Sequence, residues 1–257
     1  MTSETWINLS FLIVLVFFCI YSVLDGFDLG IGMRIPWIKD PALAGRLIGL
    51  ISPFWDGNEV WLVMGAGFLF AAFPQVFSAL LSAYYLPFMM VAGAYLVRAA
   101  ALEFSYHDTG RVQLWRNIFG VSSLAIVLGG LTAVGFFVQK LSMKAPGAPE
   151  TGVGFFQAPF PYLFAVAGAA VTFWHGAAYA RSQFRDTPTR RWPFRLSSLS
   201  ILGLWTIIGI RLCPNALAEA AAPLSTLKTI SVLALVMIPV ILAYTAFVYR
   251  VFRKTKP

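Results

Sequence analysis

The 257-residue sequence contains few charged residues and only two cysteines and two histidines. Charged residues make up 12% of the chain, which is about half the share found in soluble globular domains. So few charges cannot cover a water-facing surface, and an apolar content of 59% is too high for a disordered chain. The composition therefore indicates an integral membrane protein.

The two histidines and two cysteines limit the cofactors that the chain could bind alone. His107 falls in a polar loop and His175 in an apolar segment, so the pair lacks the matched depth needed to hold one haem between them. No CxxCH motif for haem attachment occurs. Cys19 and Cys213 are predicted near opposite sides of the membrane, which argues against a disulfide. We therefore expect this chain to be haem-free.

Long apolar segments account for most of the sequence. A helix needs about 20 mostly apolar residues to cross the hydrocarbon core, and the alternating pattern of a β-barrel is missing. We therefore predict an all-α, polytopic membrane protein, a single integral membrane domain over residues 1–257 with seven transmembrane helices. Pro74 is expected to end a helix, and Pro87 and Pro239 to kink theirs. The predicted spans are Ile7–Leu24, Pro53–Phe73, Val76–Val97, Asn117–Val138, Tyr162–Ala180, Leu196–Cys213 and Thr226–Val248.

The basic residues are distributed unevenly between the predicted loops. The chain has 19 Lys and Arg against 11 Asp and Glu, a net charge of +8. All but Lys140, Lys144, Arg211 and Lys228 fall in the C-terminal tail or in connections that follow odd-numbered spans. The positive-inside rule then places the N-terminus outside and the C-terminus in the cytoplasm. The first span lacks a preceding basic residue and a following cleavage site, so we expect it to be retained.

The first acidic motif lies at the predicted cytoplasmic end of the first span. If the helix continues there, Asp25 and Asp28 lie one turn apart on one face, and Gly26 and Gly30 allow a second helix to approach closely. The glycine spacing does not match the dinucleotide-binding fingerprint. Two interpretations stay open: solvated carboxylates at a helix end, or carboxylates held against a neighbouring helix to transfer protons or bind arginine.

The second acidic motif is concentrated in the first turns of the second span. Burying a carboxylate in a membrane helix costs about 2.5–3.5 kcal/mol, and a helix N-terminus offsets only part of that cost. Asp56 and Glu59 are three residues apart and are expected to face the same way, which favours an ion or proton path. Trp55 and Trp61 are typical of an interfacial aromatic belt.

Two further residues have more than one interpretation. For Arg98, at the end of the third span, we favour snorkelling to the interface, and the alternative is an ion pair with Asp25, Asp28 or Asp56. For His175, we favour a hydrogen-bonded packing residue. The alternative is a group that handles protons or binds a quinone carbonyl.

These motifs, in this order, resemble subunit II of the cytochrome bd-type terminal oxidase family. The resemblance covers nearly the whole chain, and WDGNEVWL is its most specific part. The matching segments are Asp25–Gly32 (DGFDLGIG), Pro53–Leu62 (PFWDGNEVWL), Phe68–Pro74 (FLFAAFP), Arg98 with Glu103 and Phe104, Gly176–Tyr179 (GAAY) and Pro239–Ala246 (PVILAYTA).

The resemblance implies a subunit that stabilises a haem-bearing oxidase subunit I in the prokaryotic cytoplasmic (inner) membrane. The complex would reduce dioxygen to water with quinol electrons, and haems b and d would lie in the partner. The family's acidic residue in the cytoplasmic proton path falls on Asp56, with Asp25, Asp28 and Glu59 as further candidates. A structural quinone is the one cofactor expected near this chain, with His175 and Trp55 as candidate contacts. Small accessory subunits and membrane lipids are further expected partners, and nucleic acid is not.

One departure from the family concerns the number of helices. Its subunit II normally has nine, so two are missing here between the fifth and sixth predicted spans. We expect a four-helix bundle with a reduced second bundle, and the donor stays open between quinol and a c-type cytochrome. Two other functions fit the same carboxylates: a seven-helix proton-coupled transporter or channel that needs no partner, or a purely structural scaffold.

Overall fold

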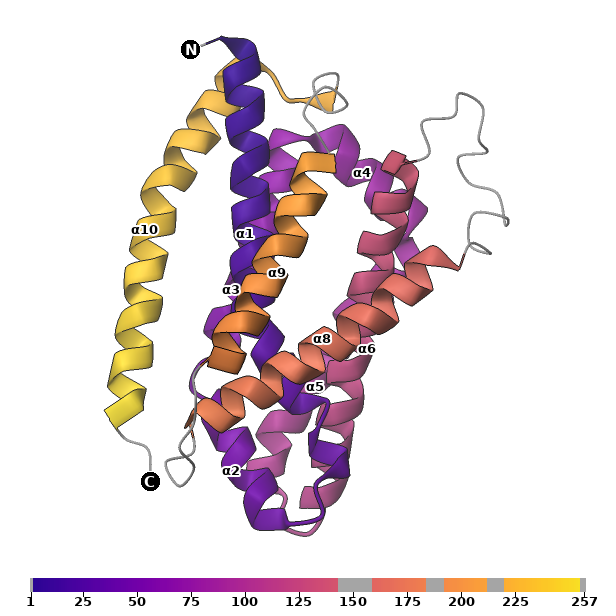
Figure 1. Ribbon diagram of the computed structural model, residues 1–257, viewed down its shortest axis with the longest axis vertical. Coiled ribbons are helices and arrows are strands. Elements are labelled where there is room, and N and C mark those ends of the chain that lie inside the picture. Colours follow the sequence, from indigo (N-terminus) through magenta and orange to yellow (C-terminus); the bar gives the residue numbers. More distant parts are fainter. Residues whose placement is uncertain (1, 143–158, 184–191, 212–219, 255–257) are drawn as a thin grey trace. The chain divides into compact units, whose positions relative to one another are not determined.

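The computed structural model describes residues 2–142, 159–183, 192–211 and 220–254. Within these ranges it contains helices and no strand, which confirms the predicted all-α class. Figure 1 shows the helices in chain order by colour. They are α1 (Ser3–Gly32), the short 3-10 helix η1 (Ile35–Trp37), α2 (Pro41–Ile51), α3 (Trp55–Ala72), α4 (Pro74–Ala83), α5 (Tyr85–His107), α6 (Val112–Ser142), α8 (Phe160–Gln183), α9 (Trp192–Arg211) and α10 (Leu224–Lys254).

The number of candidate spans is smaller than the seven predicted. Five helices in the described part of the chain are long and apolar enough to cross a membrane: α1 with η1, α5, α6, α8 and α10. Helices α3 and α4 reach this standard only together, as a pair bent by 117°, which gives five or six candidates. Polar residues in the first turns of α3 lower its hydropathy, and the apolar part of α9, Pro193–Gly209, is shorter than the others.

The third predicted span, Val76–Val97, is wrong in its boundaries. The structure breaks this segment at Tyr84, so that α4 ends at Ala83 and α5 runs from Tyr85 to His107. A continuous helix would bring the Pro87 ring against the Ala83 carbonyl, whereas in a first turn its missing N–H is not needed. Pro87 therefore marks a helix start and not the expected kink. Pro74 behaves as predicted, because α3 ends just before it.

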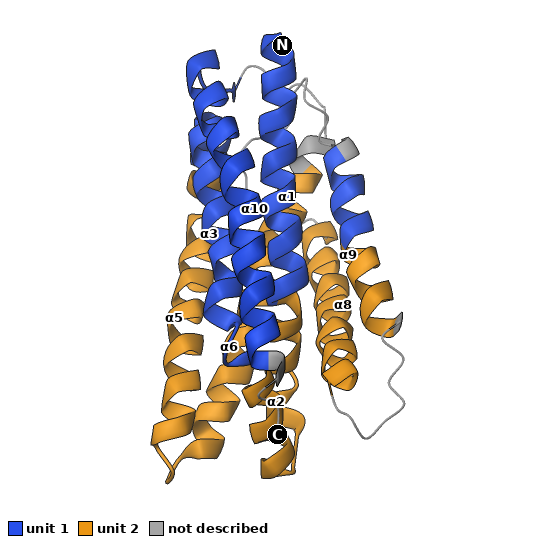
Figure 2. Ribbon diagram, turned by 90° about the vertical axis from the view of Figure 1, so that its left-hand side faces the viewer, with its two compact units in different colours: residues 1–25, 51–79, 202–257 blue, residues 26–50, 80–201 orange. Residues whose placement is uncertain are grey.

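The chain divides into two compact units, coloured separately in Figure 2. Unit 1 comprises residues 1–25, 51–79 and 202–257, and unit 2 comprises residues 26–50 and 80–201. Helices α1, α4 and α9 each contribute a part to both units, and α2 contributes its last residue, Ile51, to unit 1. The candidate site residues are accordingly described within their own units.

In unit 1, the first part of α1 lies beside α3 and α10 (Figure 2). The fully buried Phe17 of α1 contacts Trp61 of α3, with 6.1 Å between ring centroids. The hydroxyl groups of Ser10 on α1 and Ser231 on α10 share a buried hydrogen bond of 2.9 Å. Polar contacts of this kind hold helices together in an apolar surrounding, so α10 is fixed along α1.

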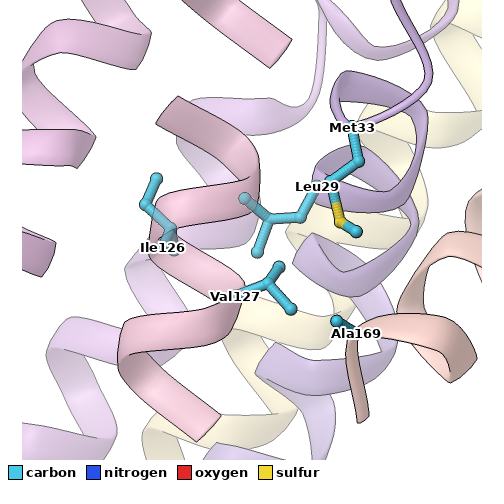
Figure 3. Packing of buried hydrophobic residues seen from close by; sticks show 5 residues of the cluster. All are labelled: Leu29, Met33, Ile126, Val127 and Ala169. Atoms are coloured by element: carbon cyan, nitrogen blue, oxygen red, sulfur yellow. The ribbon is translucent and has the colours of Figure 1, made fainter. Parts of the chain in front are cut away.

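In unit 2, α6 packs along both α5 and α8. The last turns of α1 lie against this group through a cluster of buried apolar residues, shown in Figure 3. Its members are Leu29, Met33, Ile126, Val127 and Ala169. The cluster holds the second half of the first acidic motif against α6 and α8.

Candidate functional site

Helix α1 continues through the first acidic motif and ends at Gly32. Asp25 and Asp28 therefore lie one turn apart, as predicted. Both side chains are fully buried, at 0% exposure. The interpretation of solvated carboxylates at a helix end is wrong, and the alternative of carboxylates held inside the protein fits the structure.

The second acidic motif forms the first turns of α3, in unit 1. Asp56 lies in the first turn and is exposed, whereas Glu59 and Trp55 are half-buried. The two acids thus share a helix face only in part. The positive end of the helix dipole favours the Asp56 carboxylate at this position. Together with Asp25, unit 1 therefore contains an exposed, a half-buried and a fully buried carboxylate.

An amide between these two acids connects three helices. Asn58 of α3 is 1% exposed, and its Nδ2 donates a hydrogen bond of 3.4 Å to the Leu24 carbonyl oxygen of α1. The same Nδ2 lies 3.0 Å from the Tyr249 Oη of α10, and that Oη lies 3.2 Å from Asn58 Oδ1. Because Leu24 precedes Asp25, the amide links the two acidic motifs within unit 1.

Sequence reasoning does not select Asn58 or Tyr249 as candidate residues. They lie 191 positions apart, so no local spacing relates them. The signal that could have found Asn58 is an uncharged amide within an apolar helix, where an unpaired polar group is costly. Tyr249 carries no such signal, because a tyrosine near a predicted membrane interface is expected.

Asp28 belongs to unit 2 and lies near α8. It directly follows Phe27 in the chain. The Tyr179 ring stacks on Phe27, with 3.9 Å between centroids and 17° between planes. Asp28 thus follows directly on the aromatic packing between α1 and α8.

His175 is fully buried in the same unit. Its Nδ1 and the Ser197 Oγ share a hydrogen bond of 2.7 Å, and its ring stacks on Phe194 at 4.9 Å. This environment fits the favoured interpretation of a hydrogen-bonded packing residue. The roles of His175 and Trp55 as cofactor contacts stay predictions. No group of three or more His, Cys, Asp or Glu that could hold a metal ion occurs among the residues that the structure describes.

Arg98 is also fully buried in unit 2, so the snorkelling interpretation is wrong. Its guanidinium carbon lies 5.2 Å from the centroid of the Phe119 ring, a cation–π contact between α5 and α6. Of the three carboxylates considered as partners, Asp28 lies in this unit, and Asp25 and Asp56 lie in unit 1. Of the candidate residues, unit 1 contains Asp25, Trp55, Asp56 and Glu59, and unit 2 contains Asp28, Arg98 and His175.

Comparison with known proteins identifies relatives of this chain. A family model described as cytochrome bd terminal oxidase subunit II matches residues 6–210. The cytochrome bd ubiquinol oxidase subunit 2 of Bacillus subtilis is 47% identical over 129 residues, 48% of this chain and 38% of that protein. The cytochrome bd-I ubiquinol oxidase subunit 2 of Escherichia coli K12 is 29% identical over 210 residues, 74% of this chain and 54% of that protein.

A third relative is the probable cytochrome oxidase subunit 2 of Haemophilus influenzae, 31% identical over 178 residues, 64% of this chain and 46% of that protein. The chain thus spans about half the length, or less, of these curated relatives. The range matched by the family model includes every candidate site residue and leaves α10 outside.

Proposed function

Because this chain belongs to the cytochrome bd terminal oxidase subunit II family, we propose that it is the haem-free subunit of a bacterial quinol:oxygen oxidoreductase. It pairs with a haem-bearing subunit I and stabilises it, and the partner's haems b and d supply the electron transfer to dioxygen. The candidate membrane spans and two relatives named as ubiquinol oxidase subunits support this function. Family membership favours it over a transporter or channel that acts alone.

In this proposal, acidic residues of this chain form a path that passes protons into the complex. Reduction of dioxygen to water consumes protons as well as electrons. Exposed Asp56 receives a proton at the start of α3, half-buried Glu59 lies one turn further, and fully buried Asp25 lies on α1. The observation that carries the proposal is the Asn58–Leu24 hydrogen bond, because it joins the turns that bear these acids.

We expect Asp56→Asn to lower quinol-driven oxygen consumption about tenfold or more while the haem spectrum of the purified complex stays normal. The amide has the size of the carboxylate but cannot transfer the proton, and loss of proton transfer from one positioned group commonly costs 10²–10⁴-fold. The measurement is oxygen uptake per haem in the assembled complex.

Asp40→Asn is the matched control for Asp56→Asn. Asp40 is also exposed and predicted on the cytoplasmic side, and its Oδ1 accepts a hydrogen bond of 2.9 Å from the Ala42 N–H, which an asparagine oxygen can replace. Normal turnover is expected for this control. Normal turnover in an assembled Asp56→Asn complex would contradict the proton path without affecting the family assignment.

The proposed orientation places Arg111 in the cytoplasm and Lys228 outside, as the distribution of basic residues indicates. Both side chains are exposed. In a variant with Cys19 and Cys213 replaced by serine, a membrane-impermeant thiol reagent should label Lys228→Cys in intact cells. It should label Arg111→Cys only after the membrane is opened, and the reverse pattern would overturn the orientation.

A further inference from the structure

Helix α10 lies outside the range that the family model matches, yet it contacts the second acidic motif. This contact is made near the end of α10, by Tyr249. Near the start of the helix, Ser231 bonds to Ser10 of α1. Because contacts near both of its ends hold α10 against other helices of unit 1, it can keep a residue of α3 in a defined position.

The Tyr249 side chain has two separable contacts with the start of α3. Its ring stacks on Phe54, with 4.0 Å between centroids and 9° between planes. Its hydroxyl is within hydrogen-bond distance of both the nitrogen and the oxygen of the Asn58 amide. Phe54 is buried and directly precedes α3, so the stacked ring fixes the entry of the chain into the helix. The hydroxyl contact is therefore separate from the ring contact, and it can be removed while the stacked ring is kept.

The hydroxyl restricts the rotation of the Asn58 amide. Both ends of the amide contact the Tyr249 hydroxyl, and the Leu24 carbonyl, which can only accept, selects the orientation in which Nδ2 faces it. Asn58 lies between Asp56 and Glu59 in the chain, and Leu24 directly precedes Asp25. The relative position of the three acids of unit 1 thus depends on this amide.

We propose that Tyr249 is a positioning residue for proton uptake: its hydroxyl orients the Asn58 amide and thereby holds the first turns of α3 against the Leu24–Asp25 turn of α1. This inference rests on the proposed proton path through Asp56. It adds a residue of α10 to the residues that support this path, and α10 lies outside the range that the family model matches.

The test is Tyr249→Phe in the whole oxidase complex, because phenylalanine retains the ring that stacks on Phe54 and loses only the hydroxyl. We expect oxygen consumption per haem to fall about fivefold, the factor associated with one lost neutral hydrogen bond. The solvent deuterium isotope effect on turnover should rise, since proton delivery becomes the slower step. A purely structural role would lower the amount of complex and leave both values per haem unchanged.

Tyr244→Phe is the matched control, because Tyr244 lies on the same helix and is 64% exposed. Its turnover and isotope effect should equal those of the unmodified complex. A second test uses Asn58→Ala. Adding Tyr249→Phe to this variant should not lower oxygen consumption per haem any further, because the hydroxyl acts through the Asn58 amide. Additive losses would overturn the proposal.

The outcomes separate this inference from the proposed function. Full turnover in Tyr249→Phe beside a slowed Asp56→Asn complex overturns only the positioning role. Slowed Tyr249→Phe beside a normal Asp56→Asn complex overturns both, because the effect would not pass through Asp56. If Tyr249→Phe yields little complex, turnover and isotope effect per haem of the complex that does form decide: values equal to those of Tyr244→Phe overturn the proposal, and a lower turnover with a larger isotope effect supports it.

Discussion

Gly176→Ala is expected to lower the amount of assembled complex in the membrane about tenfold or more. A Cβ atom on Gly176 of α8 would lie 2.5 Å from the Ile31 nitrogen of α1 and would also collide with the Gly30 backbone. Backbone atoms within a helix cannot rotate away, so α1 and α8 would have to separate. The separation would open the buried cluster that contains Leu29 and Ala169.

Gly93→Ala is the matched control for this prediction. Gly93 lies in α5 of the same unit, and a Cβ there would meet nothing within 4 Å. Alanine favours a helix by about 1 kcal/mol over glycine, so this variant should accumulate to normal or higher levels. The measurement is the haem absorbance and the amount of this subunit in isolated membranes. Equal accumulation of the two variants would show that the α1–α8 contact can widen without cost.

The same helix contact shows what glycine spacing can and cannot predict. Gly26 and Gly30 predict a close approach, and the structure confirms it for Gly30, whose Cβ would lie 2.9 Å from the Gly176 nitrogen. At Gly26 a Cβ would lie 3.6 Å from the His175 ring, an ordinary contact. Thr172, Gly176 and Ala180 of α8 have the same small-residue spacing, but small residues four positions apart also occur elsewhere, as at Gly129 and Ala133 of α6, so the spacing alone does not identify α8 as the second helix.

The fold could be predicted where the apolar segments are long and uninterrupted. The spans predicted at Asn117–Val138 and Thr226–Val248 lie inside α6 and α10. The prediction fails around Tyr84, because hydropathy does not register the steric effect of Pro87 on the preceding turn. Hydropathy also does not identify α2, whose 11 residues are too few for a span and whose helical state depends on packing.

The charged residues of the candidate site could be predicted from the sequence, whereas the contacts that connect them could not. Acidic residues inside apolar segments are costly, so Asp25, Asp28, Asp56 and Glu59 are visible in the sequence. Their exposure follows from the rotation of each helix against its neighbours, which the residues alone do not fix. The Asn58–Tyr249 contact likewise could not be predicted, because it depends on how α10 is placed against α3.

Neutralising Arg98 is expected to prevent assembly of the complex. The guanidinium is fully buried, and a buried charge is tolerated only when an opposite charge or hydrogen bonds compensate it. If the predicted ion pair forms, Arg98→Gln leaves its carboxylate alone, which costs about 3–5 kcal/mol, a large part of the stability of a typical domain. Arg98→Lys should give an intermediate amount, because it retains the charge but loses the planar group over Phe119.

Asp28→Asn combined with Arg98→Gln is expected to restore part of the assembled complex, because the double variant leaves no uncompensated charge. Asp28 is fully buried one helical turn before Gly32, and a Cβ on Gly32 would lie 3.2 Å from the Phe119 ring that Arg98 covers. Asp28 therefore lies one turn along α1 from a residue packed against the ring that Arg98 contacts, which makes it the candidate partner of Arg98 within unit 2. Asp56→Asn should not rescue Arg98→Gln, because Asp56 is exposed. Failure of Asp28→Asn to rescue Arg98→Gln would overturn the predicted pairing of these two residues.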